Sequence, residues 1–355
     1  MVICFNLPHA NYKPFNVDES HTTPPVIIDA KQSSIAAHQL PTNNDAAAPV
    51  TAIKLTTHLV RSSTLEVAIK LQTNENVSGG FRGFQAVASY PDTLINNIAL
   101  FLTRHNFDGI DIDWRYPASR GGQSSDKVNF QKFIIRLRAR LNMINKLLAV
   151  SVSPNKSVFS NAYDSTTLSL YADMINVYAF NFTEGAETWT NNVAALYSDN
   201  TSPMSVNSST VDWISTKVRK SMLNIVVATY ARAYTLARPT RTTVASPISG
   251  PGPVGSNSQK AGYLAQYELC PLVENYATVA DDGTKTVYYT KELSWISSET
   301  GDTLAQKYSY AVINGLGGVA IYTLDWDDWK NDCGMGAFPS AAVAQDYLYS
   351  GTNEA

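Results

Sequence analysis

Eight short apolar runs, separated by segments of helical periodicity, constrain the fold of this chain more than any other feature. The runs lie at residues 2–5, 26–28, 65–69, 109–113, 147–153, 174–180, 224–230 and 318–323. Their β-branched, almost continuously apolar composition is typical of strands that are buried on both faces. Amphipathic segments flank the fourth run, at 93–106 and 129–142. Repeated alternation of strand and helix favours a parallel (β/α)8 barrel over an open, doubly wound sheet.

The interval between the seventh and eighth runs, residues 230 to 318, is far longer than one crossover helix requires. It contains the Pro/Gly-rich loop SPISGPGPVG and the β-like run TVYYT. We therefore expect a small α+β domain at residues 234–298, inserted between strand seven and strand eight. The barrel would then consist of residues 1–233 and 299–355.

The fourth run ends in alternating carboxylates followed by an arginine, in GIDIDWRYP at 109–117. The period of two in a strand places Asp111, Asp113 and Arg115 on one side and Trp114 on the other. Reactive groups of parallel barrels lie at the carboxyl ends of the strands, so we expect the first three side chains in the barrel mouth. Carboxylates are costly there unless they share protons, pair or bind a ligand. Arg115 either pairs with Asp113 or Asp111, or turns outward into solvent.

Composition excludes several classes of function. The formal net charge is −3 and the basic residues are scattered, which argues against nucleic acid or an anionic membrane as a partner. No run of 18 apolar residues is present, so we expect no transmembrane helix. No His or Cys lies beside the aspartates of the fourth run, which argues against a metal site, and nothing in the sequence indicates a cofactor.

The low charged fraction, 16% against about 25% in typical soluble domains, suits a secreted protein. The start MVICFNLPHAN lacks the features of a signal peptide, so we interpret the chain as a mature or trimmed form. Asn-x-Ser/Thr sequons are consistent with a secreted glycoprotein. They lie at Asn76, Asn155, Asn181, Asn200 and Asn207.

The segment FDGIDIDWRYP resembles the DGxDxDxE signature of family 18 glycoside hydrolases, the chitinases. Three later segments resemble the same family in the same order: VVATYARAYTLA, GPVGSNSQKAGYLAQYELC and GLGGVAIYTLDWDDWKNDCG. The resemblance implies a TIM barrel and a substrate-assisted hydrolysis, in which the signature Glu protonates the glycosidic oxygen while the acetamide of the substrate attacks. Arg115 stands at the position of that Glu, and a guanidinium has no proton to deliver at physiological pH.

Further departures from the family pattern lie at the other strand ends. The sixth strand reads INVYAFNFTEG where chitinases read close to INVMTYDFHG, so Phe180 replaces a Tyr, Asn181 an Asp and Tyr178 a Met. On the eighth strand, Tyr322 replaces the Trp that forms the floor of the sugar site in the family. At the end of the third strand, Lys70 and Leu71 replace two glycines. The candidate ligand-binding positions are Trp114, Tyr116, Tyr178, Arg232 and Tyr322. For Trp114 the favoured alternative is packing between strand and helix, and for Arg232 an equal alternative is a structural pairing. Asp111, Asp113, Arg115, Phe180 and Asn181 form the altered catalytic positions, and no catalytic residue is expected.

These departures favour a secreted chitinase-like protein without hydrolytic activity, which binds chitin oligosaccharides or other N-acetylated glycans as a lectin or signalling protein. Two alternatives stay open. One is an active glycosidase that uses a different acid, with Glu184 and Glu187 as the nearby candidates. The other is a structural or storage protein that uses only the scaffold.

The resemblance also implies a disulfide between the inserted domain and the segment after the last strand. Cys270 and Cys333 match these two positions. Cys4 lacks the partner that the resemblance would place near the second strand, so we expect it to be a buried free thiol.

Overall fold

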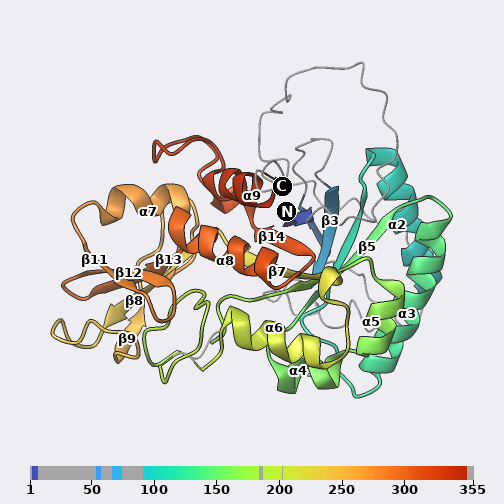
Figure 1. The fold of residues 1–355 in the computed structure, drawn as a ribbon, viewed down its shortest axis with the longest axis horizontal. Helices are drawn as coiled ribbons and strands as arrows, with labels where there is room; N and C mark the ends of the chain where they lie inside the picture. Colours follow the sequence, from blue (N-terminus) through green and yellow to red (C-terminus); the bar gives the residue numbers. More distant parts are fainter. Residues whose placement is uncertain are drawn as a thin grey trace, which may run out of the picture.

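Two β-sheets form the framework of the computed structural model, one with eight strands and one with six. The structure describes residues 2–6, 53–56, 66–73, 91–183, 187–201 and 203–349. Within these ranges the first sheet and its helices build the barrel, and the second sheet stands beside it with helix α7 (Figure 1).

The first sheet has a run of parallel strands that bends round into a ring. In spatial order these are β3 (Glu66–Thr73), β4 (Gly109–Asp113), β5 (Leu147–Val152), β6 (Met174–Val177), β7 (Leu223–Ala228) and β14 (Gly318–Tyr322). Strand β1 (Val2–Asn6) pairs with both β14 and β3 and so closes the ring. These strands match the predicted runs from 65–69 onward, and the predicted barrel fold is confirmed.

The first strands of the barrel run in a different direction from the predicted one. Strand β1 is antiparallel to β14 and to β3, and the unpredicted strand β2 (Ile53–Thr56) is antiparallel to β3. An apolar run indicates that a strand is buried but not which way it points, because direction depends on the connections. The predicted strand at 26–28 lies outside the described residues.

Helices cover the outside of the ring (Figure 1). They are α2 (Pro91–His105), α3 (Asp126–Asn142), α4 (Lys156–Ala162), α5 (Ser165–Tyr171), α6 (Val206–Ser215), α8 (Gly301–Ile313) and α9 (Pro339–Tyr349), with short 3-10 turns η1 (Lys220–Met222) and η2 (Leu324–Trp326). The first two confirm the predicted amphipathic segments. In α2 the residues Ile95, Ile98, Ala99 and Leu102 are buried, which is the spacing of one helix face. Full burial of such a Leu or Ile side chain stabilises the fold by about 1.5–3 kcal/mol.

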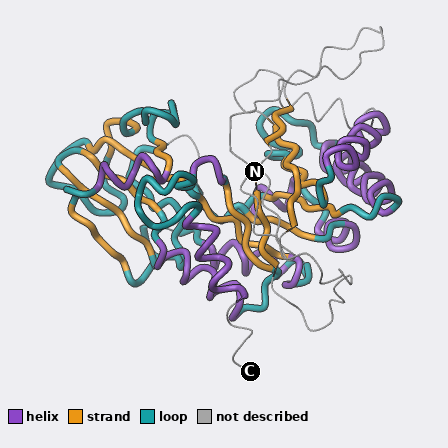
Figure 2. Tube along the Cα trace, turned by 90° about the horizontal axis from the view of Figure 1, so that it is seen from above, coloured by secondary structure: helices purple, strands orange, loops and turns teal. Residues whose placement is uncertain are grey.

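The second sheet is antiparallel throughout. Its strands are β8 (Tyr230–Leu236), β9 (Ile248–Pro251), β10 (Tyr263–Ala265), β11 (Ala277–Asp281), β12 (Thr286–Lys291) and β13 (Ser294–Ser298). Helix α7 (Gln266–Val273) accompanies them. The sheet lies at the opposite end of the molecule from α2 and α3 in both views (Figures 1 and 2). The predicted run at 224–230 is divided between β7 and β8, and the limits 234 and 298 of an inserted domain stay a prediction.

A disulfide joins Cys270 in α7 to Cys333 after β14, with 5.8 Å between the Cα atoms. It is the pair that the resemblance implies, and it ties the second sheet to the end of the barrel. The side chain of Cys4 is outside the described part of the structure, so the free thiol stays a prediction.

Removing this disulfide by Cys270→Ser together with Cys333→Ser is expected to lower the free energy of unfolding by about 4 kcal/mol, because the bridge closes a long loop in the unfolded chain. The two residues are 63 apart in the sequence. Urea denaturation of the double variant and of the wild type under non-reducing conditions measures the difference. A loss below about 1 kcal/mol would contradict the expectation.

No helix in the described ranges is long and apolar enough to span a bilayer.

Candidate functional site

An ion pair between Arg115 and Asp113 lies at the end of β4. The Nε of Arg115 is 3.2 Å from Oδ1 and 3.3 Å from Oδ2 of Asp113. The side chains are 9% and 0% exposed, so the predicted pairing is confirmed with Asp113 as partner, and the alternative of an Arg115 turned into solvent is wrong. Asp111 is buried beside them and accepts a hydrogen bond of 2.7 Å from the hydroxyl of Ser151 on β5.

The surroundings of Arg115 keep it charged. Burial disfavours the cation, but the carboxylate of Asp113 and the neighbouring tyrosines outweigh that effect, so the pKa of Arg115 lies well above its ordinary value. The guanidinium carbon lies 4.0 Å from the ring centroid of Tyr178 and 5.3 Å from that of Tyr322, both in cation–π range. Arg115 therefore offers no proton to a reacting group.

Tyr178 connects this ion pair to the aromatic side chains of the mouth. Its hydroxyl donates a hydrogen bond of 2.7 Å to Oδ2 of Asp113. Burial raises the pKa of Tyr178 well above its ordinary value, which keeps the phenol protonated and able to donate. Asp113 thus accepts hydrogen bonds from a guanidinium and from a phenol at once.

Aromatic rings pack together across the centre of the mouth. Phe180 stacks on Tyr322 at 5.6 Å between centroids and meets the ring edges of Tyr178 and Tyr230 at 5.4 and 5.9 Å. Trp326 continues the cluster at 5.6 Å from Tyr230. Tyr178, Phe180 and Tyr230 are buried, and Tyr322 and Trp326 are partly buried. These aromatic side chains therefore form one packed cluster at the carboxyl ends of β6 and β14.

A second polar cluster joins the barrel mouth to the second sheet. Arg232 on β8 donates hydrogen bonds of 2.7 Å to the side-chain oxygen of Asn181 and to the hydroxyl of Tyr263 on β10. Its other terminal nitrogen lies 3.1 Å from a carboxylate oxygen of Glu187. Asn181 has a positive φ of 46°, a conformation that Asn adopts more readily than most residues. Sequence reasoning did not assign Tyr263 to the site.

The remaining predicted contacts are placed differently. Trp114 is 2% exposed and meets Phe130 of α3 edge to face at 5.9 Å, on the side of β4 away from Arg115. The expectation that Trp114 contacts a ligand is therefore corrected: strand alternation turns the ring into the layer between β4 and its helix. Tyr116 is buried, with the guanidinium of Arg120 5.6 Å from its ring centroid. Among the described residues, no group of three or more His, Cys, Asp or Glu is arranged to hold a metal ion.

The turn that follows η2 contains two buried carboxylates, Asp327 and Asp328. Asp327 accepts hydrogen bonds of 3.1 Å from both the backbone N–H and the hydroxyl of Ser340, which opens α9. Asp328 accepts from the backbone N–H groups of Asp332 and Cys333, each at 2.8 Å. Burial raises the pKa of Asp327 to about 6 despite these bonds.

This raised pKa predicts a contribution to stability that decreases with pH. The folded state binds the Asp327 proton more tightly than the unfolded chain, so the contribution is complete below about pH 4 and is lost as the pH rises through about 6. Between these limits the difference in unfolding free energy, wild type minus Asp327→Asn, should fall by roughly 3 kcal/mol. Urea titrations from pH 4 to 8 measure it. Asp325→Asn, at an exposed carboxylate in η2, is the control, and a pH-independent difference for Asp327→Asn would contradict the prediction.

Comparison with known proteins gives one consistent family. The model for glycosyl hydrolases family 18 matches residues 5–327. The probable chitinase 10 of Drosophila melanogaster is 30% identical over 257 residues, which are 69% of this chain but 11% of that protein. Chitotriosidase-1 of Mus musculus is 29% identical over 289 residues, which are 76% of this chain and 62% of that protein. The chain thus spans less than two thirds of either relative.

A solved structure of human YKL-39, described as a pseudo-chitinase with retained chitooligosaccharide binding, superposes with a TM-score of 0.73 at 25% identity. The match covers 80% of this chain and 81% of the other. The matched family spans the strands that carry both clusters described above, including β4 with Asp111 and Asp113 and β14 with Tyr322. This chain is therefore a member of glycosyl hydrolases family 18.

Proposed function

We propose that this chain is a chitinase-like protein of family 18 without hydrolytic activity. The observation that carries the proposal is the buried ion pair of Arg115 with Asp113, at the strand end where the family signature carries its acid. General acid catalysis needs a group that gives a proton and takes it back near neutral pH, and a guanidinium does neither. The ring of Tyr178 packs on the Arg115 guanidinium and so helps to keep it at this position.

The alternative of an active glycosidase has less support. Of its two candidate acids, Glu187 has an oxygen 3.1 Å from Arg232, on the side of the mouth that faces the second sheet. Glu184 lies outside the described residues. The geometry therefore favours inactivity over a relocated acid.

The ligand in this proposal is a chitin oligosaccharide or another N-acetylated glycan. Support comes from YKL-39, a family relative described as retaining chitooligosaccharide binding without being an active chitinase. In this chain a partly buried indole, Trp326, lies 6.4 Å from the ring of Tyr263, whose hydroxyl accepts a hydrogen bond from Arg232. An aromatic face next to fixed hydrogen-bonding groups suits a pyranose ring. A secreted location belongs to the same proposal, supported by the low charged fraction and the disulfide.

Two measurements on the wild-type protein test this proposal. On a chromogenic chitobioside we expect a rate equal to that of the buffer, because Arg115 stands where the family signature carries its general acid. In a calorimetric titration with a chitin tetramer we expect binding that Trp326→Ala abolishes and that Leu170→Ala leaves unchanged, since Leu170 is 71% exposed on α5. Turnover by the wild type would exclude the pseudoenzyme proposal. Absence of binding would instead favour the scaffold alternative.

A further inference from the structure

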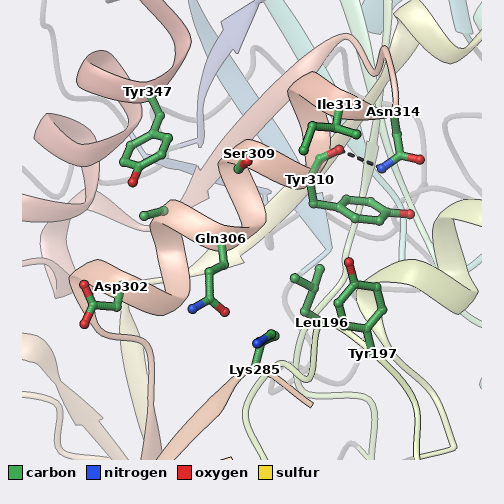
Figure 3. A pocket seen from close by; sticks show the side chains of 11 residues that line it. Leu196, Tyr197, Lys285, Asp302, Gln306, Ser309, Tyr310, Ile313, Asn314 and Tyr347 are labelled. Atoms are coloured by element: carbon green, nitrogen blue, oxygen red, sulfur yellow. Dashed lines mark hydrogen bonds between the residues drawn. The ribbon is translucent and has the colours of Figure 1, made fainter. Parts of the chain in front are cut away.

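A groove of about 470 Å³ runs along α8 and is lined by none of the residues of the barrel mouth (Figure 3). Its floor is one face of this helix, with Asp302, Gln306 and Ser309 at helical spacing. Its walls come from other parts of the chain: Tyr197 precedes α6, and Tyr347 belongs to α9. The fold therefore brings together segments that lie far apart in the sequence, and none of them carries a predicted site residue.

Tyrosine rings line both sides of the groove. Tyr197 is 39% and Tyr347 49% exposed, on opposite sides of α8 in the close view (Figure 3). Tyr310 lies beneath Tyr197, edge to face at 6.3 Å between centroids. Its hydroxyl donates a hydrogen bond of 2.9 Å to the side-chain oxygen of Asn207 on α6, which holds the ring in place. The groove thus has one fixed aromatic wall and two accessible ring faces.

One buried acceptor in the floor of the groove lacks a hydrogen-bond donor within the described residues. The Oε1 of Gln306 is buried and makes no hydrogen bond within the part of the chain that the structure describes. A buried acceptor without a donor is costly, and most such atoms in folded proteins are satisfied. Gln306 extends from the helix toward Lys285 in the close view, among the side chains that line the groove (Figure 3). The side chain of Gln306 is partly exposed, so a rotation of its amide would bring this oxygen to the groove, where a hydroxyl or amide N–H of a bound molecule would satisfy it.

The charged side chains that line the groove, Lys285 and Asp302, are of opposite sign. Lys285, in the turn between β11 and β12, lies on one side, and Asp302 at the start of α8 lies on another. The ammonium of Lys285 is also 3.7 Å from Asp282. A site for phosphate groups would gather several cations, and a site for a cationic ligand would gather carboxylates. This groove gathers neither several cations nor several carboxylates, so a neutral ligand fits it best.

We propose that the groove along α8 binds a neutral saccharide of about two rings. A pyranose presents C–H groups on its faces, which suit the rings of Tyr197 and Tyr347, and hydroxyls at its edge, which suit Gln306 and Ser309. The volume lies within the range of about 300–1,000 Å³ that is usual for small-molecule sites. This site is separate from the barrel mouth and does not depend on the function proposed for the mouth.

The test uses N,N′-diacetylchitobiose, cellobiose and lactose as probes, in titrations of the full chain followed by NMR. At least one of these disaccharides should bind the wild type at millimolar concentration. Tyr347→Ala and Gln306→Leu should each weaken that binding about tenfold, through the loss of a ring face and of the buried acceptor. Val312→Ala is the matched control, because Val312 is 42% exposed on the same helix and does not line the groove.

The Trp326→Ala variant separates this site from the barrel mouth. Binding that the groove variants weaken and that Trp326→Ala and Val312→Ala preserve supports the proposal. Binding that only Trp326→Ala removes would overturn it while supporting the glycan site at the mouth. Failure of all three disaccharides to bind the wild type would overturn it as well. Circular dichroism on each variant shows that a loss of binding does not come from unfolding.

Discussion

Replacing Arg115 by Ala is expected to lower the free energy of unfolding by about 3–5 kcal/mol, the usual cost of removing one member of a buried ion pair. The side chain of Asp113 is fully buried, and the change takes away the positive charge that faces it. It also removes the cation that packs on the ring of Tyr178 and leaves a cavity at the end of β4. Urea denaturation at pH 7 of the wild type and the variant measures the difference.

Two further variants isolate the contribution of the charge. Arg136→Ala breaks an exposed ion pair with Asp92, whose side chains are 50% and 69% exposed, and should cost less than about 1 kcal/mol. Combining Arg115→Ala with Asp113→Asn should cost less than the sum of the single changes, because the buried charge disappears with its partner. Equal losses for Arg115→Ala and Arg136→Ala would show that the ion pair at the barrel mouth contributes no more than a surface pair.

Local patterns in the sequence predicted those parts of the fold that depend on nearby residues. The amphipathic segments at 93–106 and 129–142 became α2 and α3 because their apolar residues recur at helical spacing. The run at 109–113 became β4, buried at every position. The direction of β1 was not predictable in this way, since an apolar run reads the same in either direction and pairing is decided by distant segments.

The same division between local and distant contacts holds at the candidate site. The alternation of side chains along β4 was sufficient to place Asp111, Asp113 and Arg115 on one side. Because Arg115 and Asp113 carry opposite charges, their proximity predicted the ion pair. The contact of Tyr263 with Arg232 depends on the pairing of β10 with β8, which no local pattern reveals.

The partner of Asp111 shows the same limit. Ser151 reaches Asp111 from the neighbouring strand β5, across 40 residues of sequence. A serine in an apolar run carries no signal that distinguishes a hydrogen bond to a carboxylate from simple burial. The hydrogen-bonding role of such a residue can be recognised only when the register between the strands is known.

The single change Arg115→Glu is expected to leave chitobioside hydrolysis at the level of the buffer. A positioned general acid commonly contributes about 10² to 10⁴ in rate, but only when the substrate is held against it. Here Phe180 lacks the hydroxyl that the family pattern places at this position, and Asn181 is held by Arg232 rather than carrying the charge that the family places there. Groups that act as a unit are strongly non-additive, so one restored member recovers little.

The triple variant Arg115→Glu, Phe180→Tyr and Asn181→Asp is therefore the minimal set for which we expect detectable cleavage. It returns the acid, the hydroxyl and the carboxylate that the family uses to protonate the leaving oxygen and to hold the acetamide. Adding Tyr322→Trp should increase the rate further, because it returns the Trp that the family pattern places at this position. The rates of the wild type and of the single, triple and quadruple variants are compared between pH 5 and 7. Turnover by the single variant equal to that of the triple variant would show that Arg115 alone blocks the chemistry and that the changes in the strand-six segment are neutral.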